Sequence, residues 1–405
     1  MPHAFAGLRI LDFSQVLAGP ACTNFFSMQG ADVIKVENPV AGDQFRGLMK
    51  TDKFDDYGMS PGFMSLNTGK RSLAIDLKHP QAKAIIHRLI ESSDILVENF
   101  RAGVIETLGY SYDAVRAIKP DIIYCSVSGY GQEGPKAGAP AYDGAIQAAS
   151  GMMSVTGHPE TGPTRTGYTV VDMSTAVTAA FAISAALHRR RDAGLGQRLD
   201  VAMMDTAMWM MSPLMSSHIV GGEEFKLNGN NSPVMTPTSN VFPASDGYLQ
   251  ITGLTEQHAA AIVEVLELDA SDSRLQSTQT MRDNHDEVRD MFAAAMRERP
   301  LTHWLERLSA AKVPHAPIRD YQGVLADPQL AHRGILVDAP VPASATAATG
   351  ENVQLIGAAY VADQDGPAVT GPAPVLGEHI NAVLAEAGYS PAEVAAFREA
   401  GVFGA

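Results

Sequence analysis

Short apolar runs typical of buried strands alternate with helical segments in the N-terminal part of the chain. Residues 8–14 (LRILDFS) and 31–37 (ADVIKVE) have the strand pattern, and the helix between them ends at Gly30. The same order returns at residues 71–100, where RSLAIDLK and DILVENF enclose a helix with Pro80 in its first turn. This alternation predicts an α/β fold with a doubly wound parallel sheet, in which ligands bind beyond the carboxyl ends of the strands.

The length of the chain and one polar segment predict a second domain. At 405 residues the chain exceeds the ~250–300 residues at which a single hydrophobic core usually splits. Residues 228–239 (NGNNSPVMTPTS) are rich in Gly, Asn and Pro, as linkers are, and a turn at Asp246 and Gly247 joins two strand-like runs just beyond them. We therefore expect a large domain over residues 1–225 and a smaller α+β domain over residues 226–330.

Charge and cysteine content narrow the class of function and the compartment. The net charge of −15 argues against a general binder of nucleic acid. The only cysteines, Cys22 and Cys125, form neither a disulfide framework nor a zinc pattern, and no helical His pair suggests another metal site. We therefore expect no metal and a reducing, cytoplasmic compartment. The apolar run at residues 176–187 is shorter than the ~20 residues that span a bilayer, and the first residues lack the pattern of a secretory signal, so no membrane association is expected.

Three glycines follow the strand-like run at residues 121–128 with the spacing of a dinucleotide-binding motif. Such a motif, here Gly129, Gly131 and Gly134, must open a helix whose free N–H groups hold a pyrophosphate. Pro135 follows the third glycine, and no acidic residue ends a strand ~20 positions further on, so a nicotinamide or flavin site is not expected. Two interpretations remain open: a loop whose glycines let the backbone approach a ligand, or a tight turn after a strand.

One carboxylate precedes the long helical stretch that begins near residue 174. Asp172 lies after an apolar run (TGYTVV) and before that helix, where an aspartate commonly acts as an N-cap and accepts hydrogen bonds from the first turn. The partial positive charge at the same helix end would also keep the carboxylate ionised, as a nucleophile requires. Spacing alone leaves both interpretations open.

The order of several sequence blocks resembles that of the family III CoA-transferases, which include formyl-CoA transferase and carnitine CoA-transferase. The likeness extends over nearly the whole chain. The blocks are LRILDFSQVLAGPACTNFFSMQGADVIKVENP, LNTGKRSLAIDLK, DILVENFRAGV, SGYGQEGP, VVDMSTA, GLGQRLDVAMMD, FPASDGYLQIT, LADPQLAHRGILVD and PAPVLGEHINAVLAEAGY. Within VVDMSTA the catalytic aspartate of the family falls on Asp172, so the resemblance favours the nucleophile interpretation.

The resemblance implies a fold and an assembly as well as an activity. It implies a large Rossmann-like domain built from both chain ends, residues 1–225 and 331–405, and two subunits interlocked as rings in a homodimer. The implied activity moves CoA from an acyl-CoA donor to a carboxylic acid acceptor, through an aspartyl anhydride and an aspartyl-CoA thioester on Asp172. CoA and acyl-CoA are then substrates, no tightly bound cofactor is needed, and we expect a small dicarboxylate such as succinate as one partner.

The resemblance also implies which positions meet the substrate. The CoA-binding positions of the family fall on Val16, Leu17, Ala18, Asn38, Ile75 to Lys78, Asn99, Phe100, Arg101 and Thr107. Tyr142 and Asp143 would line the acyl pocket, and Gly129 and Gly131 would shape its wall, with a plain tight turn as the alternative for the two glycines. The cations available for the CoA phosphates are Lys70, Arg71, Arg101 and Lys136.

A second activity is compatible with the same fold. Methylacyl-CoA racemases use a His-Asp pair before the helix, together with an aspartate at the position of Asp172, to move the proton α to the thioester carbonyl. Tyr142 occupies the position of that histidine here, and a phenol with a pKa near ~10 is a poor partner for proton transfer at neutral pH. The transferase is therefore the principal hypothesis, and the 2-methylacyl-CoA racemase is the alternative.

Overall fold

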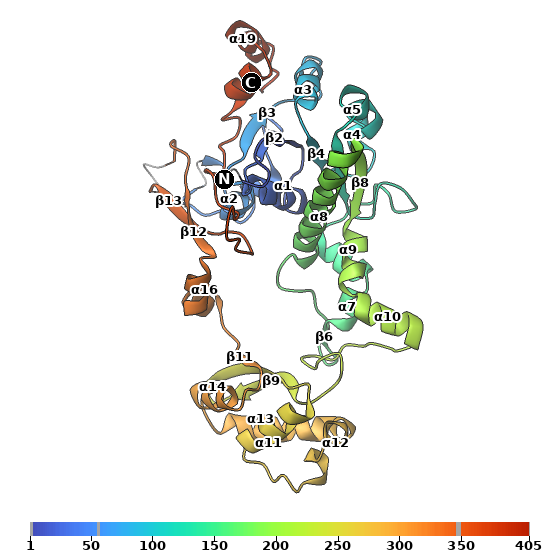
Figure 1. Ribbon diagram of the computed structural model, residues 1–405, viewed down its shortest axis with the longest axis vertical. Coiled ribbons are helices and arrows are strands. Elements are labelled where there is room, and N and C mark those ends of the chain that lie inside the picture. The colour runs from blue at the N-terminus through green and yellow to red at the C-terminus, as the bar shows by residue number, and fades with distance from the viewer. Residues whose placement is uncertain (1–2, 55–56, 346–349, 405) are drawn as a thin grey trace. The chain divides into compact units, whose positions relative to one another are not determined.

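The structure, a computed structural model, describes residues 3–54, 57–345 and 350–404. The chain forms two compact units. Unit 1 comprises Met1–Ser150, Thr166–Ser212 and Gln329–Ala405, and unit 2 comprises Gly151–Arg165 and Pro213–Pro328. Both end segments of the chain thus belong to unit 1 (Figure 1). Unit 2 covers nearly all of residues 226–330, the range expected for the smaller domain, and also takes in residues 151–165 and 213–225.

A six-stranded sheet organises unit 1. Its strands are β1 (Arg9–Asp12), β2 (Asp32–Glu37), β3 (Arg71–Ala74), β4 (Ile95–Glu98), β5 (Ile123–Ser128) and β8 (Gln197–Ala202). They follow the order β3-β2-β1-β4-β5-β8, and every neighbouring pair is parallel, as the alternating sequence pattern predicts. The order reverses between β1 and β4, which is where ligands bind in doubly wound sheets.

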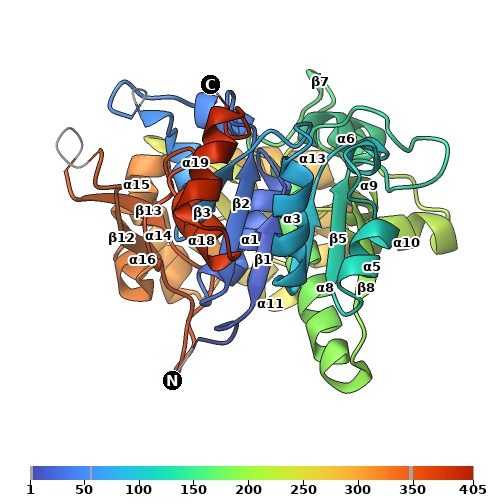
Figure 2. The ribbon, with the colours of Figure 1, turned by 90° about the horizontal axis from the view of Figure 1, so that it is seen from above.

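Helices cover both faces of this sheet, and each buries an apolar stripe against it. Helices α3 (Ala82–Glu91), α18 (Ile380–Glu386) and α19 (Pro391–Glu399) contribute to the core on one face. Helices α1 (Ala18–Ser27) and α8 (Val170–Ala193) contribute to the core on the other. Alternate strand residues enter the two cores, as the two-residue period of a strand requires. The C-terminal helices therefore complete the layer that α3 begins (Figure 2).

Helix α8 is longer than the apolar run at residues 176–187. It has 24 residues and, within the part of the chain that the structure describes, is long and apolar enough to cross a membrane by length and composition alone. A single helix of this kind is weak evidence, because core helices pass the same test. The buried side of α8, which includes Ala176, Ala179 and Ile183, belongs to the same core as α1.

A three-stranded sheet organises unit 2. Strands β9 (Ser239–Ala244) and β10 (Gly247–Thr252) form an antiparallel hairpin, and β11 (His315–Pro317) pairs with β10. The turn between β9 and β10 contains Asp246, where the sequence predicts it. The helices that share a core with this sheet are α11 (Glu256–Val265), α12 (Thr278–Asp283), α13 (His285–Arg297) and α14 (Leu301–Ala310).

Further helices and short strands connect these layers. In unit 1 they are η1 (Gln44–Gly47), α2 (Pro61–Asn67), α4 (Val104–Thr107), α5 (Tyr112–Ile118), α6 (Asp143–Ala149), α9 (Met203–Met210), β12 (Leu336–Pro340) and β13 (Asn352–Ile356). In unit 2 they are α7 (Met152–Val155), β6 (Gly157–His158), β7 (Gly162–Pro163), η3 (Ser273–Leu275) and α15 (Tyr321–Leu325). Helices α10 (Ser212–Gly221) and α16 (Pro328–Arg333) continue across the boundaries between the units.

Candidate active site

A pocket of about 240 Å³ lies in unit 1 at the carboxyl ends of β1, β4 and β5, beside the reversal of strand order. The loops after these strands and the first turn of α8 contribute to its walls. The lining residues are 15–18, 99–102, 127–131, 138–139 and 141–142, with Gln44, Asp172 and Met203. This is the position that the sheet topology predicts for a ligand.

Asp172 is the third residue of α8, and its half-buried side chain lines this pocket. The N-cap of the helix is Thr169, whose side chain makes no capping hydrogen bond. The N-cap interpretation of Asp172 is therefore wrong, because the helix already begins at Val170. Among the residues that the structure describes, none donates a hydrogen bond to the carboxyl oxygens of Asp172, so the group is available to a ligand.

The first turn of α8 is capped from another helix. Asp143, the first residue of α6, is buried, and its Oδ2 accepts the N–H groups of Val171 (2.8 Å) and Asp172 (3.2 Å). The side-chain Nε2 of Gln147 donates to the other oxygen of Asp143 and to Thr166. Both carboxyl oxygens of Asp143 are thus occupied. In contrast to the expectation from the resemblance, Asp143 supports the pocket from behind and does not line it.

The surroundings make the Asp172 carboxyl a weaker acid than an ordinary aspartate. Burial and the nearby charge of Asp143 raise the pKa of Asp172 to about 7. The sequence predicts the opposite direction, with the helix end holding the carboxylate ionised. Burial is the larger cause of the difference. Asp143 adds to it, because it already accepts N–H groups of the first turn and places a negative charge nearby. A carboxylate with a raised pKa is more basic, and hence a stronger nucleophile, once it is ionised.

We predict an acidic limit to catalysis that is set by this group. If ionised Asp172 is the nucleophile, kcat/KM falls about tenfold for each pH unit below about 7 and levels off above it, since kcat/KM reports the pKa of the free enzyme. Initial rates between pH ~5 and ~9, with stability checked at each pH, measure this limit. A profile that stays flat through pH 7 would contradict the assignment.

The pocket brings together most of the positions that the resemblance assigns to substrate. They are Val16, Leu17, Ala18, Asn99, Phe100, Arg101 and Tyr142. Tyr142 is 65% exposed, so its ring can contact a bound acyl group. The side-chain amide of Asn99 is engaged within the protein, because it accepts from the N–H of Gln15 (2.8 Å) and donates to its carbonyl oxygen (2.7 Å). Asn99 therefore joins the loops after β1 and β4.

Six other assigned positions lie outside the lining of this pocket: Asn38, the four residues Ile75, Asp76, Leu77 and Lys78, and Thr107. The side chain of Asn38 accepts two backbone N–H groups of its own turn, and Ile75 is buried in the core. Lys78 and Thr107 are exposed on the surface of unit 1. A part in binding the distal end of CoA stays a prediction for these six residues.

Two of the four candidate cations are engaged elsewhere. Lys70 is buried and pairs with Asp12 (3.1 Å), and burial lowers the pKa of its ammonium group to about 8. Arg71 forms ion pairs with Asp32 (2.6 Å) and Glu386 (2.8 Å). Arg101 lines the pocket and is exposed, and Lys136 lies close to the ring of a tyrosine in the pocket wall. Arg101 and Lys136 are thus the candidates that remain for the phosphates.

The glycine loop after β5 forms one wall of the pocket. Gly129 and Gly131 line it, whereas Gly134 does not, and the next helix along the chain is α6, which begins at Asp143. No helix opens at the third glycine, which agrees with the sequence-based rejection of a dinucleotide site. A Cβ added at Gly129 would lie 2.3 Å from the Cβ of Ala141, so this glycine permits two pocket loops to meet.

Sequence reasoning missed several lining residues. Gln15 lies three residues after the end of β1, and Tyr130 lies two residues after the end of β5. Their place in loops at the carboxyl edge of the sheet is a signal that could have found them. Gln44 and Met203 reach the pocket through the fold of η1 and the start of α9, and no local pattern marks them. Within the described residues, no group of three or more His, Cys, Asp or Glu side chains is placed to hold a metal ion.

We predict that Gly129→Ala reduces activity more than it reduces stability. The new methyl group would push against Ala141 and displace the neighbouring Tyr142, so kcat/KM should fall ~10- to 100-fold through misplacement of the pocket loop. Gly144→Ala is the matched control, because nothing lies within 4 Å of an added Cβ there and the residue is helical. Steady-state kinetics and thermal unfolding of both variants provide the test, and wild-type kinetics in Gly129→Ala would refute it.

Comparison with known proteins identifies the family of this chain. The family model for CoA-transferase family III matches residues 5–380. The chain therefore belongs to the family III CoA-transferases and is an enzyme of that class, whose members use CoA thioesters as substrates. The resemblance stated from the sequence blocks is confirmed.

Individual relatives are similar over almost their whole length. The chain is 32% identical to a succinate–glutarate CoA-transferase of Agrobacterium fabrum, over 94% of this chain and 95% of the relative. It is 34% identical to a succinyl-CoA:mesaconate CoA-transferase of Haloarcula hispanica, over 95% and 96% of the two chains. A crystal structure of a CaiB/BaiF family protein from Brucella suis superposes with a TM-score of 0.84 at 28% identity, covering 96% of this chain and 100% of that one. The mixed α/β fold with a central parallel sheet is thus a fold of this family.

Proposed function

We propose that this enzyme transfers CoA from an acyl-CoA donor to a carboxylic acid by covalent catalysis on Asp172. The observation that carries the proposal is the Asp172 carboxyl itself. It lies in a pocket at the reversal of strand order, accepts no hydrogen bond from a described residue and has a pKa raised to about 7 by burial and by Asp143. At pH ~7 about half of such a group is ionised, and its carboxylate form is strongly nucleophilic.

The proposed reaction proceeds through two covalent intermediates. A carboxylate oxygen of Asp172 attacks the thioester carbonyl of the donor, the C–S bond breaks, and an aspartyl acyl anhydride and CoA thiolate result. The thiolate then attacks the aspartyl carbonyl of the anhydride, which releases the donor acid as a carboxylate and leaves an aspartyl-CoA thioester. The acceptor carboxylate attacks this thioester to form a second anhydride, and the thiolate finally takes the acceptor acyl group and frees Asp172. Charge balances at every step, and no ATP is consumed.

The pocket wall suits the charges that develop in these steps. Each tetrahedral intermediate places negative charge on a former carbonyl oxygen, and backbone N–H groups in a partly enclosed site stabilise such charge. Gly129 and Gly131 bring the backbone close to the pocket because they carry no side chain. Arg101 is placed to meet a phosphate of CoA or the second carboxylate of a dicarboxylic acid.

We propose a small dicarboxylate, with succinate as one partner, as the acid pair. The relatives from Agrobacterium fabrum and Haloarcula hispanica, named for succinate or succinyl-CoA with glutarate and mesaconate, support this choice. The racemase alternative is less favourable, because both oxygens of Asp143 are occupied and Tyr142 replaces the histidine that would move a proton.

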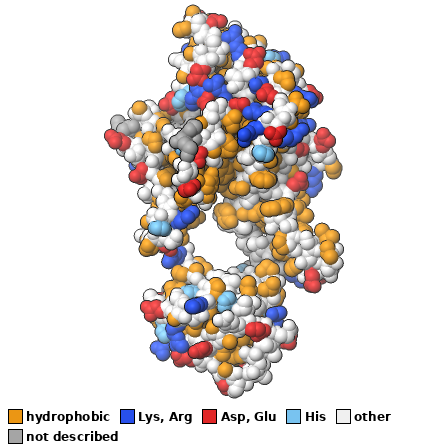
Figure 3. All heavy atoms as spheres, in the orientation of Figure 1, with side chains coloured by type: hydrophobic (Ala, Val, Ile, Leu, Met, Phe, Trp, Pro, Cys, Tyr) orange, Lys and Arg blue, Asp and Glu red, His pale blue; other side chains and the backbone are white. Residues whose placement is uncertain are grey.

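We further propose the assembly that the resemblance implies, an interlocked homodimer with a Rossmann-like domain drawn from both chain ends. Figure 3 shows hydrophobic side chains on the face of unit 1 that carries α8 and α9. Phe181 of α8 and Trp209 of α9 are 74% and 76% exposed, and Val177 is 55% exposed. Large apolar side chains exposed together are typical of a subunit interface. Sedimentation of the purified protein tests the dimer.

A direct test of the activity pairs succinyl-CoA with a panel of acids. The purified enzyme is incubated with glutarate, mesaconate or a monocarboxylate such as acetate, and the CoA thioesters are separated and identified by mass. We expect a new thioester only when donor and acceptor are both present, parallel double-reciprocal plots, and the highest kcat/KM with a dicarboxylate. Exchange of an α-proton of a 2-methylacyl-CoA with deuterated water, without transfer to any acid, would support the racemase instead.

A further inference from the structure

Side chains bond every main-chain polar group of the loop that follows β1, from the N–H of Ser14 to the N–H of Val16. Three of these side chains are buried (Asp12, Lys35 and Asp43), and Asn99 is half-buried. At Ser14, Asp12 accepts from the N–H (2.9 Å) and Lys35 donates to the carbonyl oxygen (2.8 Å). At Gln15, Asn99 accepts from the N–H (2.8 Å) and donates to the carbonyl oxygen (2.7 Å). At Val16, Asp43 accepts from the N–H (2.9 Å). These side chains come from four separate segments of the chain. The same loop supplies Gln15, Val16 and Leu17 to the pocket wall that also contains Asp172.

Val16 occupies a backbone conformation that its side chain disfavours. Its φ is +66°, in the left-handed region, where a β-branched residue is a genuine outlier. Strain of this kind persists only where the surrounding structure enforces it, and it gathers at sites of function. The left-handed turn at Val16 leads directly into Leu17 and the first residue of α1, Ala18, both of which line the pocket. The conformation of Val16 therefore sets the position of this part of the wall.

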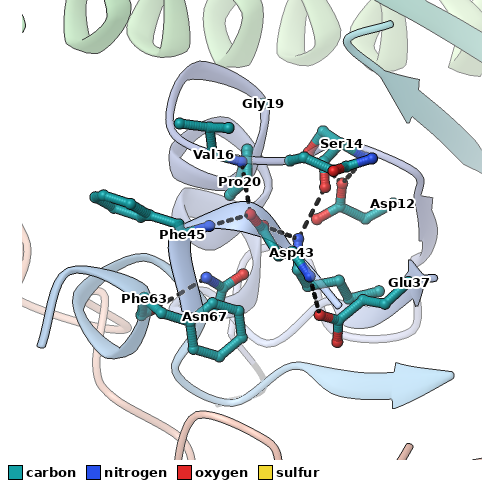
Figure 4. A network of polar contacts seen from close by, with 12 residues as sticks. Asp12, Ser14, Val16, Gly19, Pro20, Glu37, Asp43, Phe45, Phe63 and Asn67 are labelled. Carbon is teal, nitrogen blue, oxygen red and sulfur yellow. Dashed lines mark hydrogen bonds and ion pairs between the residues drawn. The ribbon is translucent and has the colours of Figure 1, made fainter. Parts of the chain in front are cut away.

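The N–H of Val16 is bonded to one member of a buried ion pair, Asp43. The Nζ of Lys35 lies 2.8 Å from Oδ2 of Asp43, and both side chains are completely buried. The other oxygen of Asp43, Oδ1, accepts the N–H groups of Val16 and Phe45 (2.8 Å). Figure 4 shows Asp43 between these two N–H groups, with Glu37 and Asp12 on the far side of the network. The backbone N–H of Asp43 in turn donates to Glu37 (3.0 Å), which fixes the carboxylate from behind.

A buried ion pair adds little to the stability of a protein, because the free energy needed to take both charges out of water can exceed their attraction. Its better supported use is to specify one arrangement among several. Here one member of the ion pair, Asp43, accepts the N–H of Val16, the residue of the pocket wall that has the strained φ. Resting on the function proposed above, we propose that Lys35 and Asp43 are positioning residues that hold Val16 in its left-handed conformation and so place the wall at Leu17 and Ala18 against the bound thioester.

The test exploits the freedom of glycine at Val16. Asp43→Ala alone would leave the buried Lys35 without its carboxylate, so the charge-free double variant Lys35→Met/Asp43→Ala is used. Lys35→Met/Asp43→Asn is the conservative change, because it keeps an acceptor for the N–H of Val16. Both are made in the wild-type and the Val16→Gly backgrounds. Glycine adopts a φ of +66° without strain, so the ion pair becomes less necessary there.

We expect kcat/KM for the acyl-CoA donor to fall at least ~30-fold in Lys35→Met/Asp43→Ala and less in Lys35→Met/Asp43→Asn. In the Val16→Gly background the loss caused by Lys35→Met/Asp43→Ala should shrink to ~3-fold or less, a coupling that a general loss of stability would not produce. All rates are measured at a temperature at which each variant is folded by circular dichroism. Equal losses in the two backgrounds would overturn the proposal.

Asp94→Ala is the matched control, because Asp94 lies just before β4, at the amino-terminal ends of the strands and away from the pocket. Asp94 also accepts a backbone N–H, from Arg9 (2.9 Å), and pairs with a basic side chain, Arg190 (2.9 Å), but it touches no pocket residue. It should lower the unfolding temperature and leave kcat/KM unchanged. Hydrogen exchange of residues 14–17 separates this proposal from the function on which it rests. Faster exchange in Lys35→Met/Asp43→Ala than in Asp94→Ala supports positioning even if the wild type transfers no CoA, whereas equal exchange overturns positioning whatever the activity.

Discussion

Asp172→Ala is expected to lower the rate of CoA transfer at least ~10³-fold while leaving the protein folded. The side chain lines the pocket and accepts no hydrogen bond from a described residue, so no hydrogen bond is lost with it. Only the nucleophile disappears, and without it neither the anhydride nor the aspartyl thioester can form. The rate is measured from product thioesters, with circular dichroism as the check on folding. Transfer within tenfold of the wild type would rule out covalent catalysis at this residue.

The isosteric change Asp172→Asn carries a second expectation, in stability. The pKa of Asp172 is about 7 in the folded protein and ~3.9 in an unfolded chain, so the folded state binds the extra proton between these values. Stability then falls as pH rises from ~4 to about 7, and the penalty is fully present above that range. Removing the charge should raise the unfolding temperature at pH ~8 and change it little at pH ~4, a gain in stability obtained with a loss of function. Equal shifts at both pH values would contradict the raised pKa.

The second large effect is expected at Asp143. Asp143→Ala removes the acceptor of two N–H groups of α8, which should cost about 1–2 kcal/mol of stability and lower kcat ~10- to 100-fold as the first turn of the helix loses its cap. Asp143→Asn retains an acceptor but removes the charge that raises the pKa of Asp172. The acidic limit of kcat/KM should therefore move to lower pH in Asp143→Asn, with a smaller loss of rate at pH ~8 than in Asp143→Ala.

Gln147 provides a matched comparison for Asp143. It donates to the far oxygen of Asp143 and accepts no N–H group of α8, so Gln147→Leu should lower stability without moving the acidic limit toward lower pH. Thermal unfolding and pH profiles of kcat/KM for the three variants distinguish the effect of losing the helix cap from the effect of losing the charge of Asp143. If the limit stays in place in Asp143→Asn, the charge of Asp143 does not set the pKa of Asp172.

Five of the six strands of the sheet were predictable from the sequence because each carries its own signal, whereas β8 was not predicted. Runs such as residues 31–37 are apolar, β-branched and bounded by turns, and their order along the chain fixes the parallel topology and the edge where ligands bind. Asp172 was predictable only with the help of the resemblance, since its spacing also fitted an N-cap. The helix in fact begins at Val170, and its first turn is capped by Asp143, 28 and 29 positions before the two residues whose N–H groups it accepts, which no local pattern reveals.

The charged groups beneath the pocket were not predictable in the same way. Lys35 lies in the middle of a strand, where a single polar residue usually indicates a solvent-exposed face, and Lys70 follows a helix as a surface lysine would. Both are completely buried because Asp43 and Asp12, distant along the chain, meet them in the folded structure. Partners of this kind are determined by tertiary packing. Lys70, one of the four cations considered for the CoA phosphates, is therefore paired with Asp12 inside the protein.

The central claim is that Asp172 becomes covalently modified during turnover, and intact mass spectrometry tests it most directly. Wild type and Asp172→Ala are incubated with succinyl-CoA, treated with hydroxylamine or borohydride to trap the activated carboxyl, and digested to locate the modification. If catalysis is covalent on Asp172, we expect a trapped adduct on the peptide that contains Asp172 in the wild type, and none in Asp172→Ala. Transfer of CoA by the wild type with no adduct at this residue, or an equal adduct in both proteins, would contradict it.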